Sequence, residues 1–344
     1  MELDRITAMS EARLDTVRLQ RIVKGFWESA ALMSAVELGV FTAIAKGDNT
    51  IARVANAVAI EAVNAERLLV ALCAMELVTR TGETFTNAPD VERFLVEGSS
   101  RFAGPWMLFA KPRWDGWGRL TEFLRQGADE QRVLGMYAEA FDEDKARRYH
   151  EATYSIGMGA ARRFHRQVDL RGRTKMMDLG GGSGCYCIVG TQQHPRLSAL
   201  VLELAPVVPI TREFVARHGL TDRIEARVCD FTRDPLPRDC DVAVMASNLP
   251  QYSREIIASV VRRVFAALQP GGEYHLIGEM LNAEGTGPHG PAFWGLSEAV
   301  NHSTGLAHRE TECRSYLEDA GFVDVCVNEF IPDTLTRVTG IKPG

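Results

Sequence analysis

The feature that most constrains this chain is a glycine-rich run that follows a short apolar segment. Residues 175–179 (Lys-Met-Met-Asp-Leu) precede Gly180-Gly-Gly-Ser-Gly184, and a helix-like apolar segment comes next. Glycine adopts backbone conformations that are closed to other residues and lets the chain approach a ligand closely. The order strand, glycine turn and helix predicts an α/β domain whose ligand lies beyond the carboxyl ends of the strands.

The C-terminal half supports this prediction, because short apolar segments alternate there with helical patterns. Such alternation predicts a Rossmann-like, doubly wound α/β sheet. The last two segments are separated by residues 328–335 only, too few for a crossover helix, which predicts an antiparallel hairpin at the sheet edge. The expected strands are residues 175–179, 199–203, 224–228, 242–246, 274–279, 323–327 and 336–341.

The N-terminal part has a different pattern. We expect a helix over residues 12–45 that breaks at Gly39, two short helices over 50–78, and a hairpin formed by 78–80 and 84–86. This is a winged-helix order, which either enters DNA or pairs with a second copy. Residues 1–100 carry 14 acidic and 10 basic side chains, so we expect dimerisation. The expected domains are 1–105 (a mainly helical winged-helix dimerisation domain), 106–168 (a helical connector) and 169–344 (the sheet domain).

Composition narrows the class of protein further. The net charge of −6 argues against nucleic acid as a partner. No apolar stretch approaches the roughly 20 residues of a spanning helix, and the N-terminus lacks the apolar run of a signal peptide. We therefore expect a cytoplasmic protein without a membrane partner. The seven cysteines include no Cys-x-x-Cys pair and are expected to be free thiols.

The glycine run fits one class of nucleotide better than another. A dinucleotide fingerprint requires a third small residue, and that position is Cys185 or Cys187 here. The spacing Asp178-x-Gly180-x-Gly182-x-Gly184 instead resembles the first motif of class I S-adenosylmethionine-dependent methyltransferases. The resemblance implies that this loop packs on the methionine part of the cofactor.

Downstream residues extend that resemblance. Glu203, 23 residues after Gly180, is placed to accept both ribose hydroxyls. Asp230-Phe231 is similar to the pair that binds the adenine amine and stacks on its ring, and Ser247-Asn248 is expected beside the sulfonium. Gln269-Pro-Gly-Gly272 is similar to the turn before the fifth strand of these enzymes.

With Tyr316–Phe322 near its end, the whole chain resembles the caffeate-type small-molecule O-methyltransferases. The resemblance implies S-adenosylmethionine as cofactor, a small-molecule acceptor and a homodimer built through the N-terminal domain. One departure affects the mechanism, because the family's His-Asp-Trp triplet is replaced by Pro250-Gln251-Tyr252. Deprotonating a hydroxyl requires a base within hydrogen-bond reach, whereas a thioether sulfur is already a neutral nucleophile.

Given that gap, the chain resembles the S-methyltransferases of dimethylsulfoniopropionate synthesis, which methylate 4-methylthio-2-hydroxybutyrate. The stretches that carry this resemblance are Asn248–Ser253 and Phe330–Gly340. Two alternatives stay open: a C- or O-methyltransferase of an aromatic, polyketide or 2-oxo acid acceptor, and a regulator that keeps the fold without catalysis.

Several residues are candidates for the acceptor side. His150, Tyr154 and Met158 share one helix face by their spacing, although core packing explains them equally well. We expect Tyr154 and Asn248 to orient the reacting groups. The other expected acceptor residues are Trp114, Trp117, Gln251, Tyr252, Trp294 and His302.

A carboxylate on the acceptor would need a cation, for which Arg113, Arg119 and His302 are candidates. His289, His302 and His308 have spacings of 13 and 6 that match no common metal pattern, so we expect no metal. Some related C-methyltransferases of 2-oxo acids bind iron, which keeps that option open.

Overall fold

The computed structural model describes residues 15–128 and 142–344, and the chain divides into two compact units, Met1–Lys111 and Pro112–Gly344. The division falls after Lys111 rather than after residue 105, and most of the expected connector belongs to the second unit. Within the described ranges, none of the helices combines the length and apolar character that crossing a bilayer demands.

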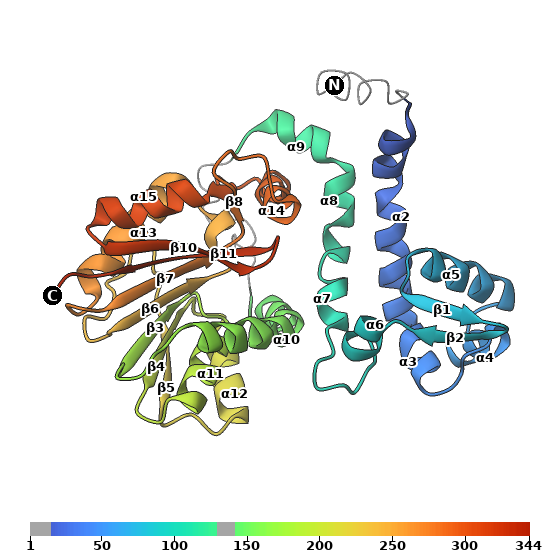
Figure 1. The fold of residues 1–344 in the computed structure, drawn as a ribbon, viewed down its shortest axis with the longest axis horizontal. Helices are drawn as coiled ribbons and strands as arrows, with labels where there is room; N and C mark the ends of the chain where they lie inside the picture. The colour runs from blue at the N-terminus through green and yellow to red at the C-terminus, as the bar shows by residue number, and fades with distance from the viewer. Residues whose placement is uncertain (1–14, 129–141) are drawn as a thin grey trace, which may run out of the picture. The chain divides into compact units, whose positions relative to one another are not determined.

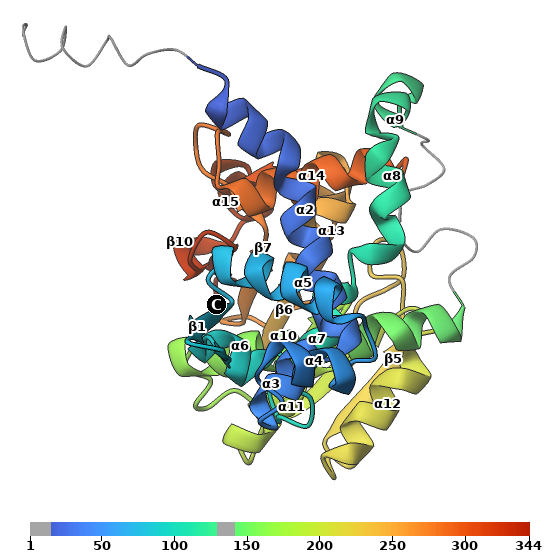
Figure 2. The same ribbon diagram turned by 90° about the vertical axis from the view of Figure 1, so that its right-hand side faces the viewer.

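The first unit is helical with one hairpin (Figure 2). Gly39 ends the first helix as predicted, because it adopts a φ of 75° that favours glycine. The hairpin pairs Val78 with Asn87, and its buried residues join the helices in one core around Phe41, Leu72 and Phe85. The elements are α2 (Val17–Leu38), α3 (Val40–Ala45), α4 (Ile51–Ala57), α5 (Ala62–Ala74), β1 (Val78–Thr81), β2 (Thr84–Asn87), α6 (Pro89–Phe94) and α7 (Gly104–Leu108), after which η1 (Lys111–Arg113) crosses the division.

The second unit is a mixed sheet covered by helices (Figure 1). Its strands are β3 (Lys175–Leu179), β4 (Ser198–Glu203), β5 (Ile224–Val228), β6 (Val242–Ala246), β7 (Glu273–Gly278), β10 (Val323–Ile331) and β11 (Leu335–Ile341). Its helices are α8 (Trp114–Gly118), α9 (Leu120–Gln126), α10 (Glu143–Gln167), α11 (Cys185–Gln193), α12 (Val208–Arg217), η3 (Leu249–Gln251), α13 (Arg254–Ala267), α14 (His289–Val300) and α15 (Glu310–Ala320).

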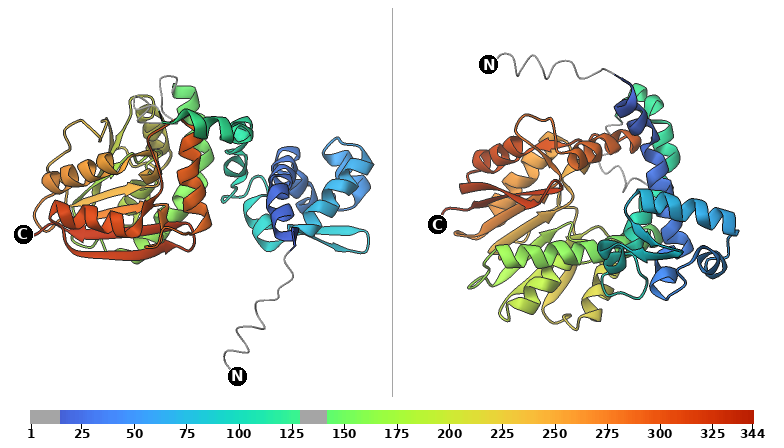
Figure 3. Two further views of the ribbon diagram at one scale, coloured as in Figure 1. Left: turned by 90° about the horizontal axis from the view of Figure 1, so that it is seen from above. Right: turned by 45° about the vertical axis from the view of Figure 1, so that its right-hand side comes forward.

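The strand order confirms the doubly wound sheet. It runs β10-β11-β7-β6-β3-β4-β5, with β3 to β7 parallel and the β10–β11 hairpin antiparallel at one edge (Figure 3). Strand β10 is longer than predicted, because its alternating residues remain paired with β11 up to Ile331. The short parallel pair of β8 (Met280–Leu281) and β9 (His308–Arg309) was not predicted, since two residues carry no periodicity.

The two faces of the sheet bury two separate cores. Successive strand residues point to opposite faces, so Met176 packs with α10, α11 and α12, whereas Met177 packs with α13 and α15. The strands are apolar on both faces, as expected for a parallel sheet covered on each side. We therefore look for side chains that bind a ligand or react at the ends of the strands.

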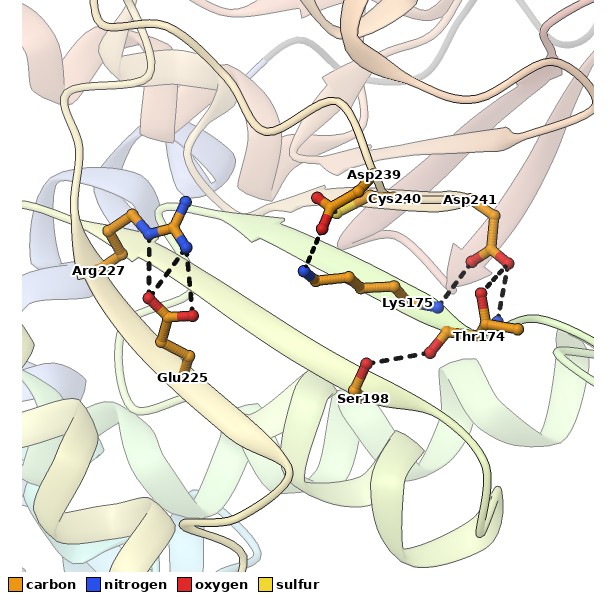
Figure 4. Close-up of polar contacts among 8 residues, drawn as sticks. All are labelled: Thr174, Lys175, Ser198, Glu225, Arg227, Asp239, Cys240 and Asp241. Atoms are coloured by element: carbon orange, nitrogen blue, oxygen red, sulfur yellow. Dashed lines mark hydrogen bonds and ion pairs between the residues drawn. The ribbon is translucent and has the colours of Figure 1, made fainter.

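At the amino ends of the strands, hydrogen bonds and ion pairs join neighbouring segments of the chain (Figure 4). The Asp241 carboxylate accepts hydrogen bonds from the Thr174 and Lys175 N–H groups, at 2.7 and 2.9 Å. Ser198 Oγ donates to Thr174 O at 3.1 Å, and the Lys175 ammonium lies 2.5 Å from an oxygen of Asp239. The glycine run lies at the opposite, carboxyl edge.

Candidate active site

The glycine run connects β3 to α11 through left-handed backbone. Gly180, Gly182 and Gly184 have φ values of 66°, 56° and 76°. Other residues reach this region only with strain, so the chain needs glycine at all three positions. Gly184 is also the N-cap residue of α11.

Close packing holds this loop in place. A Cβ atom at Gly180 would lie 2.6 Å from Asn248 Nδ2, and one at Gly181 would lie 2.5 Å from the Asp178 carboxyl. A Cβ atom at Gly182 would lie 2.7 Å from Cε1 of His150. The loop therefore brings together side chains from β3, from α10 and from the segment after β6.

Glu203, at the end of β4, is buried beside the loop. Its carboxylate accepts hydrogen bonds from Gly182 N (3.0 Å) and Leu204 N (2.8 Å). Burial raises its pKa to about 7, although both backbone hydrogen bonds favour the ionised form. Each oxygen has lone-pair capacity left, which is what two ribose hydroxyls require of a carboxylate.

Asp178 points to the same face of β3 as Met176, which is the face covered by α10, α11 and α12. Burial, and next the nearby Glu203 charge, raise its pKa to about 7. Its Oδ1 has no hydrogen-bond partner among the described residues, and Oδ2 lies 3.9 Å from Cys187 Sγ. Cys187 and Cys185 are buried, and burial raises the pKa of both thiols, that of Cys185 to about 12, which disfavours the nucleophilic thiolate form.

Asp230 and Phe231 follow β5. One Asp230 oxygen accepts hydrogen bonds from Thr232 N (3.0 Å) and Thr232 Oγ1 (2.5 Å), and the other lies 2.8 Å from Arg233 Nε. The buried Phe231 ring meets Tyr252 at a centroid distance of 5.6 Å and lies 3.1 Å from the position of a Gly180 Cβ atom. The aromatic ring thus forms one wall beside the glycine loop.

The segment after β6 contacts the loop through Asn248. Its amide nitrogen donates to the carbonyl oxygens of Leu179 and Gly180, both at 3.2 Å. The neighbouring Ser247 is exposed and has a φ of 58°. Asn248 therefore binds the backbone of the loop. Its expected role at the reacting groups stays a prediction.

Residues 250–252 supply no proton acceptor. Gln251 is buried, and its Oε1 has no hydrogen-bond partner in the part of the chain that the structure describes. The carbonyl oxygen of Tyr252 accepts from Nε2 of His308 at 2.9 Å, so this histidine supports the segment. Burial lowers the pKa of His308, which keeps the ring neutral.

The three residues expected on one face of α10 have different neighbours. His150 is buried against Gly182, and burial lowers its pKa to about 4. Met158 belongs to the sheet core. The hydroxyl of Tyr154 lies 2.6 Å from His218 Nε2, and its ring stacks on Phe214 of α12. Helix α10 thus directs Tyr154 towards α12, and its expected role at the reacting groups stays a prediction.

The remaining acceptor candidates lie on α8, α14 and the segment after α14. Trp117 meets Phe293, the neighbour of Trp294, at 6.4 Å, and His302 packs edge-on against Phe123 at 4.6 Å. Trp114 is more than one-third exposed.

Among the candidate cations, Arg113 donates to Asn301 Oδ1 at 2.6 Å, and burial lowers its pKa. Arg119 pairs with Glu122 at 2.9 Å. Of the two, Arg113 is the more buried cation of this region.

Two residues were missed by the sequence prediction. Thr211 of α12 donates from Oγ1 to Gly182 O at 2.6 Å, and only contact in space shows this. Glu279 follows β7 at the carboxyl edge and is buried, and its Oε2 has no hydrogen-bond partner among residues 15–128 and 142–344. Burial raises its pKa to about 7. An acid directly after a buried strand was a signal for Glu279 that we did not use.

The three histidines considered for a metal have separate surroundings. His289 stacks on Phe293, His302 packs on Phe123, and His308 lies beside Tyr316. In the described ranges, no group of three or more His, Cys, Asp or Glu side chains gathers as a metal site.

Comparison with known proteins agrees with this geometry. The chain matches the O-methyltransferase domain model over residues 117–323 and the O-methyltransferase dimerisation domain model over residues 20–97. It is 30% identical over 328 residues to 3-hydroxy-5-methyl-1-naphthoate 3-O-methyltransferase of Streptomyces sahachiroi, with 94% of each chain covered. It is 28% identical over 310 residues to the N,N-dimethyltransferase OxyT of Streptomyces rimosus, covering 88% of this chain and 90% of that one.

A solved structure shows the same fold. Human N-acetylserotonin methyltransferase in complex with SAM (S-adenosylmethionine) superposes with a TM-score of 0.82 at 22% identity. The match covers 97% of this chain and 100% of the human chain.

Proposed function

The chain belongs to the O-methyltransferase family, and on that premise we propose that it transfers the methyl group of S-adenosylmethionine to a small molecule. Bound here, this cofactor supplies an electrophilic methyl group on a sulfonium. The side chains at the glycine loop suit it, because the carboxyl groups of Asp178 and Glu203 lie against the loop. Such a site favours a cationic nucleoside over a pyrophosphate, and family membership argues against a non-catalytic regulator.

Each part of the proposed cofactor site has one task. Glu203 accepts the ribose hydroxyls, and its bonds from Gly182 N and Leu204 N fix the direction of its lone pairs. Phe231 offers its ring to the adenine, and Asp230 accepts the adenine amine. Asn248 acts as a positioning residue, because it ties the loop to the end of β6.

For the acceptor, we propose a soft neutral nucleophile, by preference the thioether sulfur of 4-methylthio-2-hydroxybutyrate. The observation that carries this proposal is the segment Pro250-Gln251-Tyr252, which has no side chain that removes a proton at neutral pH. Transfer to sulfur requires orientation and exclusion of water, both of which a buried segment supplies. The family is not confined to oxygen acceptors, since one relative carries the name of an N,N-dimethyltransferase.

Two polar groups are suited to the rest of such an acceptor. Gln251 Oε1, which has no partner among the described residues, accepts a hydrogen bond from the acceptor's hydroxyl group, and Arg113 offers a guanidinium to the acceptor's carboxylate. Arg113 is the better of the two arginines for this role, because Arg119 is paired with Glu122.

A second candidate function rests on Glu279. Methylation of a phenolic hydroxyl requires a proton acceptor, and this buried carboxyl, with its pKa raised to about 7, is the group at the carboxyl edge that matches the task. The Streptomyces sahachiroi relative, by its name, methylates a hydroxyl group. In this alternative the protein methylates an aromatic or polyketide hydroxyl.

Initial rates with labelled S-adenosylmethionine separate the two candidates. The panel contains a thioether acid, a phenol, an amine and a 2-oxo acid, assayed from pH 6 to pH 9. The proposal predicts the highest rate with the thioether acid, unchanged in the variant Glu279→Gln. A rate that is highest with the phenol and is lost in Glu279→Gln overturns the thioether proposal and supports the alternative.

We further propose that the first unit forms a homodimer through α2. Apolar side chains recur along this helix with high exposure, at Leu19, Ile22, Val23 and Trp27, which are 52% to 72% exposed. A monomer seldom leaves such a row in water, and the matched dimerisation domain begins at residue 20. Light scattering of the double variant Ile22→Glu, Val23→Glu tests this, with a monomer as the expected result.

A further inference from the structure

A hollow of the second unit lies away from the glycine loop, between the segment that follows β5 and the C-terminal half of α13. It has a volume of about 250 Å³. Three arginines line it, Arg233, Arg238 and Arg263, together with the apolar side chains of Pro235, Leu236 and Ala267. Three cations around one small hollow repel one another unless an anion joins them.

Arg263 fixes the shape of this hollow. Its guanidinium on α13 donates to the carbonyl oxygens of Arg233 (3.0 Å) and Asp234, which ties the loop to the helix. Its Nε is buried and has no hydrogen-bond partner among the residues described. Because Nε is shielded from solvent, Arg263 offers an anion in the hollow the N–H groups of its two terminal nitrogens that the carbonyl oxygens leave free.

The nearby carboxylates offset the charge of the three arginines only in part. Asp230 pairs with Arg233 at 2.8 Å, and Asp234, which accepts from Asp230 N at 2.8 Å, adds a second negative charge. Asp239 lies 2.5 Å from the Lys175 ammonium. Within the described ranges Arg238 makes no ion pair, so the hollow keeps an excess of positive charge.

We propose that this hollow binds a phosphate group, as the free ion or as a small phosphomonoester. Guanidinium groups pair with phosphate oxygens in a two-pronged geometry, and three arginines line this hollow, of which Arg238 makes no ion pair among the described residues. A hollow of about 250 Å³ has room for a phosphate and a small organic group. Pro235 and Leu236 give that group an apolar wall.

The site is coupled to the cofactor site through one residue. Arg233 lines the hollow, and its guanidinium also forms an ion pair with Asp230. A bound phosphate draws Arg233 away from Asp230, whose oxygen then becomes available to the adenine amine. This coupling rests on the proposed role of Asp230 at the cofactor, and linkage requires it to act in both directions.

Calorimetric titration at constant ionic strength tests the site directly. Inorganic phosphate and phenyl phosphate are each titrated into the cofactor-free protein. We expect one saturable site per chain and an affinity at least about fivefold weaker in Arg238→Gln and in Arg263→Gln. Arg238 has no ion pair to lose, so its variant should fold normally. Tighter binding of phenyl phosphate identifies a phosphomonoester, and equal or weaker binding identifies the free ion.

The matched control is Arg227→Gln, on β5 outside the hollow and paired with Glu225 at 3.0 Å (Figure 4). This variant should bind phosphate as the wild type does. The absence of saturable binding, or an equal loss in all three variants, overturns the proposal, since either result means general attraction to a charged surface.

A second titration measures the coupling with S-adenosylhomocysteine. Phosphate should tighten its binding by about two- to fivefold, as expected for freeing an exposed ion pair, and the effect should vanish in Arg238→Gln. Phosphate binding with an unchanged cofactor affinity contradicts the coupling and leaves the site standing. Failure of S-adenosylhomocysteine to bind at all contradicts the proposed function instead, and the phosphate titration does not depend on it.

Discussion

The two sides of the candidate active site are built by different means. On the cofactor side the glycine loop is held mainly through its backbone, by Glu203 on Gly182 N, Thr211 on Gly182 O and Asn248 on two carbonyls. On the proposed acceptor side two side-chain oxygens have no partner in the described chain, Gln251 Oε1 and Glu279 Oε2, whereas the cofactor side has one such oxygen, Asp178 Oδ1.

This difference separates the binding of a cofactor that a whole family shares from the selection of one acceptor. A loop fixed by its backbone presents the same surface whatever the acceptor is, so it serves a cofactor common to a whole family. Buried polar atoms without partners are costly, and sites that use them select the ligand that completes their hydrogen bonds. We therefore expect the acceptor side to decide which small molecule is methylated.

The largest expected effect comes from adding one methyl group to the loop. In Gly182→Ala a Cβ atom would lie 2.7 Å from the His150 ring at a φ of 56°. Backbone strain and overpacking of about 1–3 kcal/mol each should weaken S-adenosylhomocysteine binding about 30-fold or more, measured by calorimetry. The control Gly159→Ala, where nothing lies within 4 Å, should bind normally. Equal affinities for both variants would show that the loop does not define the cofactor site.

The next effect concerns the charge of Glu203. Replacement by Gln removes the ionised acceptor and should weaken S-adenosylhomocysteine binding by roughly tenfold to 100-fold. The pKa of Glu203 is raised to about 7, so below that pH the carboxyl is mostly protonated and must lose its proton when the ligand binds. The free energy of losing this proton weakens binding. Wild-type affinity should therefore rise about tenfold from pH 6 to pH 8, and the variant should lose this dependence. Glu225→Gln, on the surface of β5, is the control, and a pH dependence retained in Glu203→Gln would contradict the assignment.

A smaller effect tests the acceptor side through stability. The pKa of Glu279 is about 7 in the folded chain and 4.5 as a reference, so the folded state holds the proton more tightly. The tighter hold on this proton contributes to the free energy of unfolding, and the contribution is complete below pH 4.5 and is lost as the pH rises through 7. Glu279→Gln should thus be more stable than wild type at pH 8, by about 1–3 kcal/mol, and the gain should shrink at pH 5. Urea unfolding at both pH values measures this, and a gain independent of pH would mean that Glu279 ionises freely.

The smallest effect is expected at Tyr154. Tyr154→Phe removes the hydrogen bond to His218 and should cost about 0.5–1.5 kcal/mol of stability while changing the methyl-transfer rate less than about twofold. Thermal unfolding and initial rates measure the two quantities. A large loss of rate at unchanged stability would restore Tyr154 to the reacting groups.

The sequence predicted the parts that depend on local pattern. The strands β3, β5 and β6, the break at Gly39 and the need for glycine at 180, 182 and 184 follow from periodicity and backbone conformation. The contact of Tyr154 with α12 was not predicted, because spacing along a helix shows which side chains share a face and does not show which element that face meets.

Thr211 was missed for the same reason, because it reaches Gly182 only after α12 packs on the sheet, and such a contact has no local signature in the sequence. Glu279 did have a signal, an acid directly after a buried strand, but its burial follows from the folded structure.

A crystal structure of the complex with S-adenosylhomocysteine tests the central claim most directly. The account predicts the methionine part against residues 180–184 and both ribose hydroxyls within hydrogen-bond distance of Glu203. A nucleoside bound elsewhere, or a Glu203 carboxylate that contacts no hydroxyl group of the ligand, would contradict it.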